Sequence, residues 1–495
     1  MARTYLSLIQ ANPMTGALEH NFDSIATTLA SLAPVQGPHL VVLPWGAIEG
    51  GTGAGALRWA DARDHYETIL NRLGELAQGS CAIVVPYRDK DDEPKVAFFH
   101  RGTRTNLDFQ GFIEWGEVRF ALDLATPSDL FLVFNAPSQV GSSPMKRPLR
   151  ASCFVSIAGG DGMLIARGQT GYCQDNTVTT LHPWEAGVLQ LALDREGDAS
   201  VNISEVYRST PKFPSVCADE RYEALRTGLR DYVKKNGIKG VVLGISGGID
   251  SALCAMIAVD ALGAEAVKGV RLPSRFTSDV SLVGAQRLAE QLGFELIDLP
   301  IEPLFEASLQ TLAPLYGDRA WDVTEENLQA RARAVLLMAV ANKENRLLIC
   351  TSNKAEAAMG YGTLYGDITG GYAPLIDLFK GDVVALCRAR NAAAGRELIP
   401  EMIITRAPSA ELREGQLDSD SLPPYDEIEW VISALLRKES LRALRTRLGD
   451  DTVNTIVHRF FANAYKRAQA IPGPAVSDIP LSLTASWGLG RDWLH

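Results

Sequence analysis

The chain has 495 residues, of which 46% are hydrophobic and 22% are charged, and its formal net charge is −11. This charge disfavours nonspecific binding to nucleic acid or anionic membranes, and no apolar run reaches the roughly 20 residues that a membrane helix needs. The seven cysteines are scattered without a CxxC pair and the opening MARTYLSLIQANP lacks the features of a secretion signal, so we expect reduced thiols in a cytoplasmic protein of two or three domains.

Residues 1–205 alternate short strand-like runs with helical stretches. The strand-like runs are rich in β-branched or aromatic residues and end in turn residues, as in TYLSLIQANP, HLVVLPWG, CAIVVPYRD, KVAFFHRG, DLFLVFNAP, ASCFVSIAGG and VLQLALD. The helical stretches are LEHNFDSIATTLASLA and RDHYETILNRLGELAQ. This pattern predicts an α/β domain with many short strands.

Residues 206–219 contain prolines without a sustained period and are predicted to be a linker. Beyond them, DERYEALRTGLRDYVKKNG carries acidic residues early, lysines late and a closing glycine, which predicts a helix. Strands and helices then alternate through 241–245, 250–262, AVKGVRLP, 278–292, FELIDLP, 325–342 and RLLICTSN. This order predicts a second domain over 220–475 with a doubly wound parallel sheet, followed by an irregular tail at 476–495.

The string SGGIDS directly follows the first strand of the second domain. In a doubly wound sheet this loop lies at the ligand-binding edge. Gly247 and Gly248 permit a tight turn whose N–H groups can hold a phosphate, and Ser246 and Ser251 can add hydroxyl donors. Asp250 would repel a phosphate unless a Mg²⁺ ion bridged them. The alternative is a plain turn in which Asp250 only caps the helix.

SGGIDS resembles the loop of the N-type ATP pyrophosphatases, which cleave ATP between the α and β phosphates. The later strings ENLQAR, TSNKAE, YGDITGG, PSAEL and YKR resemble the NAD synthetase family in its larger, glutamine-dependent bacterial form. The resemblance covers residues 220 to about 475. It implies a sheet like that of the adenine nucleotide α-hydrolases. GMP, asparagine and argininosuccinate synthetases are similar only in the loop.

The resemblance implies a role for each matching position. ATP would be contacted by Gly244, Ile245, Ser246, Gly247, Gly248, Ile249, Asp250, Ser251, Arg271, Thr351, Lys380 and Ser409. Deamido-NAD, the nicotinic acid dinucleotide, would be contacted by Asn327, Arg331, Glu356 and Lys466. Mg²⁺ would be bound by Asp250 and Glu356. Taken singly, Lys380, Glu356 or Arg331 could equally be surface residues of a helix, but their joint order behind the loop favours the site.

The implied reaction has two steps. The nicotinate carboxylate attacks the α-phosphorus of ATP to give an acyl-adenylate and pyrophosphate, and ammonia then attacks the activated carbonyl to release AMP and NAD. Asp250 and Lys380 would be the catalytic residues, because Mg²⁺, the Lys380 ammonium and the loop N–H groups stabilise the charge of the leaving pyrophosphate. No covalent enzyme nucleophile is needed. The family also implies a homo-oligomer.

The amino-terminal half resembles the nitrilase-like glutaminase domain of the larger family members, beginning with LIQANPMTGALEHNFDSI. That domain implies an α/β sandwich and a Glu–Lys–Cys triad. Here Trp45 in VVLPWGAIEGG stands at the glutamate position, and Arg104 in RTNLDFQGFIEW stands at the lysine position. EWGEVRFALDLATPSDLFLVFNAP, where the thiol belongs, contains no cysteine. The sequence therefore favours an inactive pseudo-glutaminase and free ammonia as nitrogen donor.

Two alternatives are open. The first is a glutamine-dependent enzyme with an unorthodox glutaminase site, in which Glu49 and either Cys153 or Cys173 replace the missing groups. The second is a nucleotide sensor without catalytic activity. Retention of Asp250 and Lys380 weighs against a sensor, because a sensor has no need of leaving-group contacts.

Overall fold

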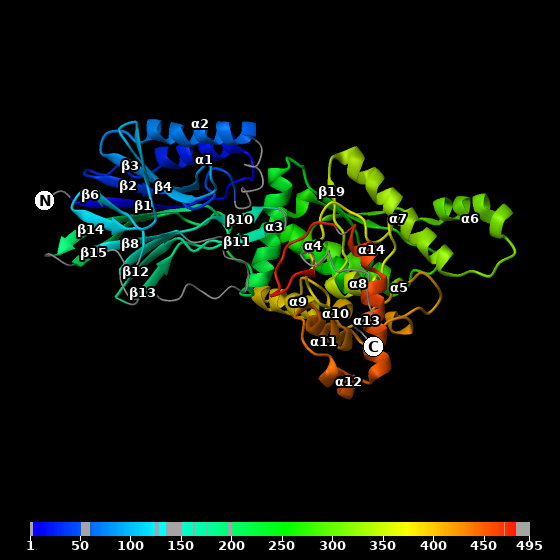
Figure 1. The fold of residues 1–495 in the computed structure, drawn as a ribbon. Coiled ribbons are helices and arrows are strands. Elements are labelled where there is room, and N and C mark those ends of the chain that lie inside the picture. The colour runs from blue at the N-terminus through cyan, green and yellow to red at the C-terminus, as the bar shows by residue number, and fades with distance from the viewer. Residues whose placement is uncertain are drawn as a thin grey trace. The chain divides into compact units, whose positions relative to one another are not determined.

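The computed structural model describes residues 3–50, 60–123, 128–134, 151–161, 164–175, 177–196, 200–469 and 471–481. The chain divides into two compact units, Met1–Pro214 and Ser215–His495 (Figure 1). Both units are α/β, as the sequence predicted. None of the helices in these ranges combines the length and apolar character needed to cross a membrane.

The amino-terminal unit is built from two main sheets. A seven-stranded sheet has the order β15-β14-β1-β2-β3-β4-β5, and a six-stranded sheet has the order β13-β12-β9-β8-β7-β6. A short pair, β10-β11, accompanies them. The strands are β1 (Thr4–Gln10), β2 (His39–Val42), β3 (Cys81–Arg88), β4 (Pro94–His100), β5 (Thr103–Leu107), β6 (Phe112–Trp115), β7 (Val118–Ala121), β8 (Leu130–Phe134), β9 (Ser152–Val155), β10 (Ala158–Asp161), β11 (Leu164–Arg167), β12 (Gly171–Gln174), β13 (Thr177–Thr180), β14 (Gly187–Glu196) and β15 (Ser200–Arg208).

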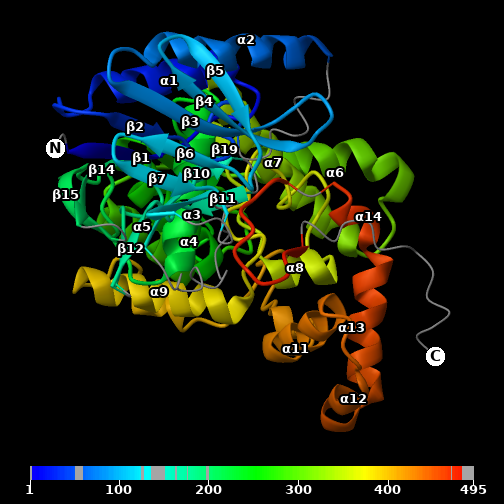
Figure 2. The same ribbon diagram turned by 60° about the vertical axis from the view of Figure 1, so that its left-hand side comes forward.

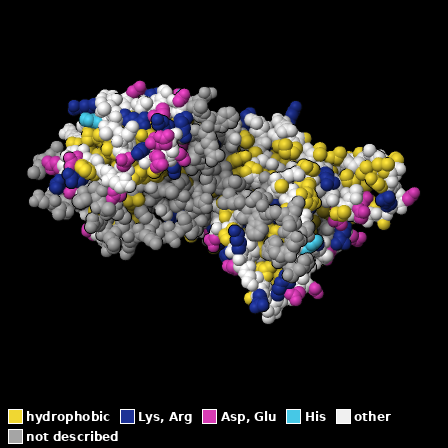
Figure 3. All heavy atoms as spheres, in the orientation of Figure 1, with side chains coloured by type: hydrophobic (Ala, Val, Ile, Leu, Met, Phe, Trp, Pro, Cys, Tyr) yellow, Lys and Arg dark blue, Asp and Glu magenta, His cyan; other side chains and the backbone are white. Residues whose placement is uncertain are grey.

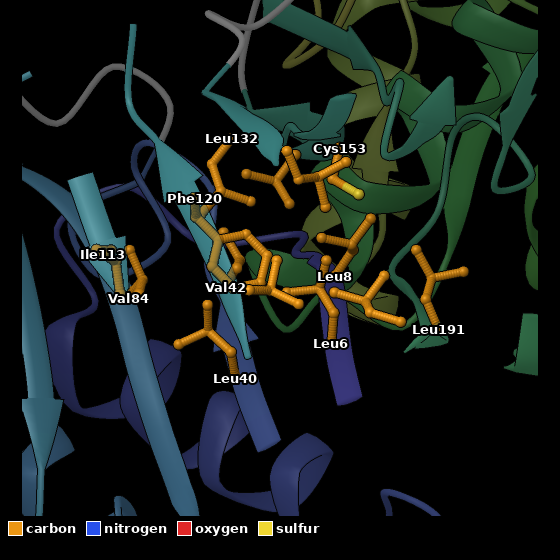
Figure 4. Packing of buried hydrophobic residues seen from close by; sticks show 14 of the residues in the cluster. Leu6, Leu8, Leu40, Val42, Val84, Ile113, Phe120, Leu132, Cys153 and Leu191 are labelled. Carbon is orange, nitrogen blue, oxygen red and sulfur yellow. The ribbon is translucent and has the colours of Figure 1, made fainter. Parts of the chain in front are cut away.

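Alternate residues of the central strands supply two separate cores. Leu6 and Leu8 of β1 pack between the sheets with Phe120 and Leu132 of the second sheet (Figure 4). Ile9, one position along, belongs to the other core, under helices α1 (Leu18–Ala30) and α2 (Ala60–Leu76). Both helices lie over one face of the seven-stranded sheet (Figure 1). The period of two along each strand thus separates a sheet-on-sheet layer from a helix-on-sheet layer, which gives the predicted sandwich.

The predicted linker began too early. Strand β15 continues to Arg208, which pairs with Leu189 of β14, so residues 206–208 are part of the sheet. Val201 and Ile203 of β15 are buried in the core. The later residues of this strand are mostly polar, and pairing with β14 rather than their own composition keeps them extended.

The carboxyl-terminal unit contains a four-stranded parallel sheet with the order β18-β17-β16-β19. The strands are β16 (Val241–Gly244), β17 (Val267–Arg271), β18 (Glu295–Asp298) and β19 (Leu347–Leu348). After β16 the chain adds β17 and β18 on one side and then places β19 on the other side. The strand order therefore reverses at β16, and the crevice beyond its carboxyl end is the expected ligand site of such a sheet.

Helices surround this sheet. They are α3 (Glu220–Lys235), α4 (Ile249–Leu262), α5 (Asp279–Leu292), α6 (Glu302–Tyr316), α7 (Val323–Glu344), α8 (Lys354–Met359), α9 (Lys380–Ala394), α10 (Glu401–Ile404), α11 (Tyr425–Leu436), α12 (Arg442–Leu448), α13 (Asp450–Ala462) and α14 (Ala464–Arg467). Helices α11, α12 and α13 form a group next to α8 in both views (Figures 1 and 2), and they share a hydrophobic core with it.

Local signals set several helix starts. The Asp219 side chain accepts a hydrogen bond from the backbone N–H of Arg221 at the start of α3. Asp322 and Glu325 form a capping box at the start of α7. Each such cap satisfies N–H groups that the first helical turn leaves without an acceptor. The described part of the predicted tail is not loose: the backbone N–H groups of Val476 and Ser477 bond to buried Asp377. Residues 482–495 lie outside the described residues.

Candidate functional site

A cavity of about 690 Å³ lies at the carboxyl end of β16. Its wall is formed by the loop after β16, the end of β17, one face of α7 and the segments around residues 351–369 and 406–421. This volume falls within the range of small-molecule binding sites. The reversal of strand order and the cavity thus coincide at the loop that the sequence singled out.

Two serines hold the loop between β16 and α4 in shape. The Ser251 hydroxyl donates to the Gly248 carbonyl at 3.0 Å and lies 3.1 Å from the Ser246 hydroxyl. Gly247 has φ of +79°, and an added Cβ would lie 2.4 Å from the Ser281 carbonyl oxygen, so only glycine fits. Gly247 faces α5, whereas Gly248 and Asp250 line the cavity. The free N–H groups of the first turn of α4 make this end of the cavity suitable for an anion.

Asp250 and Glu356 approach one another at the bottom of the cavity. The Asn353 side-chain amide donates to Asp250 Oδ1 at 3.2 Å and to Glu356 Oε1 at 2.9 Å, so both carboxylates lie around one nitrogen. Lys380 Nζ donates to Asp250 Oδ2 at 2.5 Å. Burial, together with the charge of Asp250, raises the pKa of Glu356 to about 8. Burial opposes the charge of Lys380, but Asp250 and Glu356 outweigh it and raise its pKa.

This arrangement suits a divalent cation that completes its coordination with ligand oxygens. Burial and the nearby charge of Asp250 both disfavour the ionised form of Glu356, and a bound divalent cation would favour it. Among the described residues no group of three or more His, Cys, Asp or Glu side chains could hold a metal. Mg²⁺ fits a site with two carboxylates, because it commonly takes its remaining ligands from water and phosphate.

A third carboxylate, which sequence reasoning did not identify, lies behind Lys380. Asp418 accepts hydrogen bonds from the hydroxyls of Tyr425 at 2.7 Å and Tyr361 at 3.1 Å. Lys380 Nζ lies 5.2 Å from the centre of the Tyr425 ring, a cation–π contact. These residues come from α9, α11 and two loops, so no spacing along the chain signals their meeting.

The side of the cavity next to α7 is polar. The side-chain amide oxygen of Asn327 accepts a hydrogen bond from the Thr363 hydroxyl at 2.7 Å. Lys466 Nζ donates to the backbone carbonyls of Gly360 at 2.7 Å and Gly362 at 2.6 Å. Asn327 and Lys466 line the cavity. Desolvation lowers the pKa of Lys466. These predicted residues therefore do meet in one place.

Arg331 does not join them. It is exposed, is not part of the cavity wall, and donates from Nε to the Leu364 carbonyl at 3.3 Å. Arg333, two positions on, lines the cavity instead. The other residues of α7 that line the cavity lie on one side of Asn327 around the helix, and the rotation of about 40° from Asn327 to Arg331 goes the other way, off the cavity face.

The other predicted contacts lie on the cavity wall, and the polar groups of Arg271 and Ser409 are already in use. Arg271 forms two hydrogen bonds with Asp298, at 2.5 and 2.6 Å. The Ser409 hydroxyl donates to the Gln416 carbonyl at 2.5 Å. Thr351 also lines the cavity.

In the amino-terminal unit, aromatic side chains occupy the neighbourhood of Trp45. Its ring stacks on Phe109 with centroids 5.7 Å apart, and Phe109 meets the edge of Phe134 at 6.0 Å. Arg104 Nη1 is paired with Glu67 at 2.7 Å, and its guanidinium lies 4.6 Å from the centre of the Tyr87 ring. Neither predicted triad position therefore offers a proton-transferring group.

The residues that could replace the missing glutaminase groups, Glu49, Cys153 and Cys173, are buried. Burial raises the pKa of Glu49 to about 7 and raises the pKa of Cys153, a core residue, far above its usual value. Cys173 is buried as well. Strands β7 and β8 are parallel, yet residues 122–129 alone connect them. A crossover between parallel strands usually needs a dozen or more residues, so this connection is unusually short.

Several known proteins are similar to this chain. A family model described as NAD synthase matches residues 221–470. A glutamine-dependent NAD(+) synthetase from Xanthomonas campestris pv. campestris (strain 8004) is 34% identical over 530 residues, which cover 95% of this chain and 94% of that protein. A protein of the same name from Thermotoga maritima is 44% identical over 277 residues, covering 56% of this chain and 47% of that protein.

A solved structure is similar over both units. The glutamine-dependent NAD+ synthetase from Acinetobacter baumannii in complex with adenosine diphosphate has a TM-score of 0.71 and 26% identity, with 96% of each chain covered. The predicted fold class, an amino-terminal α/β sandwich followed by a domain with a parallel sheet, is thereby confirmed.

Proposed function

The chain belongs to the NAD synthase family, as its motifs indicated, and on that premise we propose that it amidates deamido-NAD to NAD with ATP as the activating substrate. One observation carries the proposal. The phosphate-type loop after β16, the Asp250–Lys380 pair and the polar wall with Asn327 and Lys466 all face a single cavity. A nucleotide and an acceptor can therefore lie side by side, which is what a transfer between them requires.

ATP would bind with its phosphates at the loop. The N–H groups of the first turn of α4 and the positive end of that helix would attract the phosphates. Arg271 and Thr351 line the adjoining wall, and Ser409 lies across the cavity. Because Arg271 is already paired with Asp298, its contribution would come from the shape of the pocket.

Deamido-NAD would bind against α7. The amide of Asn327 and the ammonium of Lys466 supply a hydrogen-bonding group and a positive charge on that wall. A dinucleotide acid carries negative charge, so a cation is needed there. Arg331 would contribute only if it left its exposed position.

The chain's residues would assist the first step by binding and neutralising the leaving pyrophosphate. As an oxygen of the nicotinate carboxylate bonds to the α-phosphorus, the bond from that phosphorus to the bridging oxygen breaks. The loop N–H groups and Lys380 face the phosphates as this charge develops. Asp250 and Glu356 would hold Mg²⁺, which when bound neutralises phosphate charge. Ammonia then displaces AMP from the acyl-adenylate.

Two nitrogen donors are in question, and the relatives favour glutamine over the free ammonia that the sequence predicted. The relative from Xanthomonas is named for glutamine and is similar over 95% of this chain, the amino-terminal unit included. The observation for ammonia is the aromatic stack of Trp45 and Phe109 together with the engaged Arg104, where glutamine hydrolysis would need a carboxylate and an amine. The chemistry in the carboxyl-terminal unit is the same with either donor.

A paired assay tests the proposal. The pure chain is incubated with ATP, Mg²⁺ and deamido-NAD, with either ammonium or glutamine, and NAD and pyrophosphate are measured. We expect NAD and pyrophosphate in equal amounts with ammonium. A matching rate with glutamine would assign an active glutaminase, and no rate with glutamine would assign ammonia. Absence of both products with both donors would leave the nucleotide sensor as the function.

We also propose that copies of the chain assemble with each other. Hydrophobic side chains gather over α6 and α7 (Figure 3), where Leu315 is 68% and Val323 is 62% exposed. Apolar surface of this kind commonly marks an interaction site. Light scattering coupled to size-exclusion chromatography should give a mass above 53.6 kDa, and a monomer at high concentration would contradict the proposal.

A further inference from the structure

Arg333 occupies the cavity face of α7. Residues 326, 330, 333, 334 and 337 of this helix line the cavity, a spacing of three and four that marks one face. Arg333 is the arginine of this face, and its positive charge is directed to the same space as the phosphate-type loop.

The charge of Arg333 lacks a paired carboxylate among the described residues. Its Nε donates a hydrogen bond to the backbone carbonyl of Leu272, at 3.0 Å. Asp367 and Glu411 act on it only at longer range. Both have other partners: Glu411 accepts from Arg406 at 2.6 Å, and Asp367 accepts from the Thr363 N–H at 2.7 Å.

This isolation is costly for a cation. A half-buried guanidinium without a counter-charge loses hydration without compensation, and burial lowers the pKa of Arg333 to about 10. The group is still positively charged at neutral pH. An anion that enters the cavity would remove this cost, and a guanidinium is suited to a phosphate because it can donate two parallel hydrogen bonds.

The position of Arg333 indicates which anion it meets. Leu272, its hydrogen-bond acceptor, follows β17 and lies beside the nucleotide loop on the cavity wall. Thr363 and Asp367, on the other side, belong to the segment that bonds Asn327. Arg333 therefore lies between the wall assigned to ATP and the wall assigned to deamido-NAD.

We propose that Arg333 binds the α-phosphate of ATP at the junction of the two substrate walls and keeps hold of it in the acyl-adenylate. This inference rests on the proposed function, since it presumes that an adenylyl group is transferred in this cavity. Arg333 forms no bond to the reacting atoms. It orients the phosphorus toward the nicotinate carboxylate and stabilises the added negative charge.

A pair of ligands tests the contact without turnover. AMP contains the α-phosphate and adenosine lacks it, so their affinity ratio isolates the phosphate contact. Calorimetry should show that Arg333→Gln binds AMP roughly 10- to 100-fold more weakly than the wild type and binds adenosine equally well. Arg333→Lys should recover part of the loss. Arg331→Gln, on the same helix outside the cavity, is the matched control and should keep the wild-type ratio.

Kinetics supply the second measurement. In the ammonium assay, Arg333→Gln should lower kcat by at least tenfold while the KM for deamido-NAD changes less than threefold, because the contact is with the group being transferred. The proposal is overturned if Arg333→Gln melts like the wild type and keeps the wild-type ratio of AMP affinity to adenosine affinity. It is also overturned if Arg331→Gln loses as much AMP affinity as Arg333→Gln does. If the wild type forms no NAD, the proposed function fails, whereas the ligand ratio still decides whether Arg333 binds phosphate.

Discussion

A buried ion pair at the start of α8 should control both stability and activity. Asp377 and Lys354 are 1% and 2% exposed, and Lys354 Nζ lies 3.0 Å from Asp377 Oδ1. Asp377 also accepts from the backbone N–H groups of Val476 and Ser477 and from the Ser477 hydroxyl, at 2.7 to 2.8 Å. The pair thereby fastens the chain's last described segment to the start of α8.

The expected cost of Asp377→Ala follows from these contacts. Removing one partner of a buried ion pair costs about 3–5 kcal/mol, because the other charge is left uncompensated. For a unit of this size, 1 kcal/mol shifts the melting temperature by about 2–4 °C, so the variant should melt roughly 6–20 °C below the wild type. Lys354→Met should cost less, because Asp377 keeps its other donors.

The assay is thermal and chemical denaturation of the full chain, followed by the ammonium assay well below the melting point. Helix α8 carries Glu356 and is capped by Asn353, so loosening it should lower kcat even in the folded variant. Arg388→Ala is the control, since its pair with Glu401 is about half exposed on both sides and should be worth less than 1 kcal/mol. A melting temperature for Asp377→Ala within 2 °C of the wild type would refute this reasoning.

Three further predictions concern the site. Gly247→Ala should raise the KM for ATP more than tenfold, because φ of +79° and the Ser281 oxygen leave no room for a methyl group; an unchanged KM would show that the loop does not bind ATP. Tyr425→Leu should lower kcat several-fold and Tyr425→Phe much less, since the ring under Lys380 is retained in the second variant; equal losses would assign the effect to the hydroxyl. In the absence of metal, the pKa of Glu356 in the folded state is about 8, above the ordinary value of 4.5, so the folded state binds this proton more tightly than the unfolded state does. Glu356 should therefore lower the free energy of unfolding as pH rises from 5 to 8. The melting-temperature advantage of Glu356→Gln over the wild type should thus grow from pH 5 to pH 8, and a constant difference would contradict it.

The loop between β16 and α4 was predictable because the sequence features that indicate it are local. A buried strand, two glycines and a helix start follow one another between residues 241 and 262, and each depends on neighbours a few positions away. The helix caps at Asp219 and Asp322 are of the same kind. The alternation of strands and helices likewise predicted a parallel sheet, and parallel connections are restricted enough to place the loop at its carboxyl edge.

Other features depended on contacts between distant segments. Asp418 meets Tyr361 and Tyr425 only after two loops and α11 have packed together. In the amino-terminal unit, Trp45 stacks on Phe109, which in turn meets the edge of Phe134. These three residues are far apart in the sequence, so the aromatic group around residue 45 forms only in the fold. Side-chain contacts of this kind have no fixed spacing along the chain.

The sequence by itself determined the two-domain α/β plan, the phosphate-type loop and the order of the motifs behind it, because hydrophobic period, turn residues and capping residues act over a few positions. Only the tertiary structure decided which arginine of α7 enters the cavity. Arg331 and Arg333 are two positions apart and are chemically identical, but a helix turns by about 100° per residue and its orientation against the sheet is set by packing. That packing directs Arg333 to the cavity and leaves Arg331 exposed.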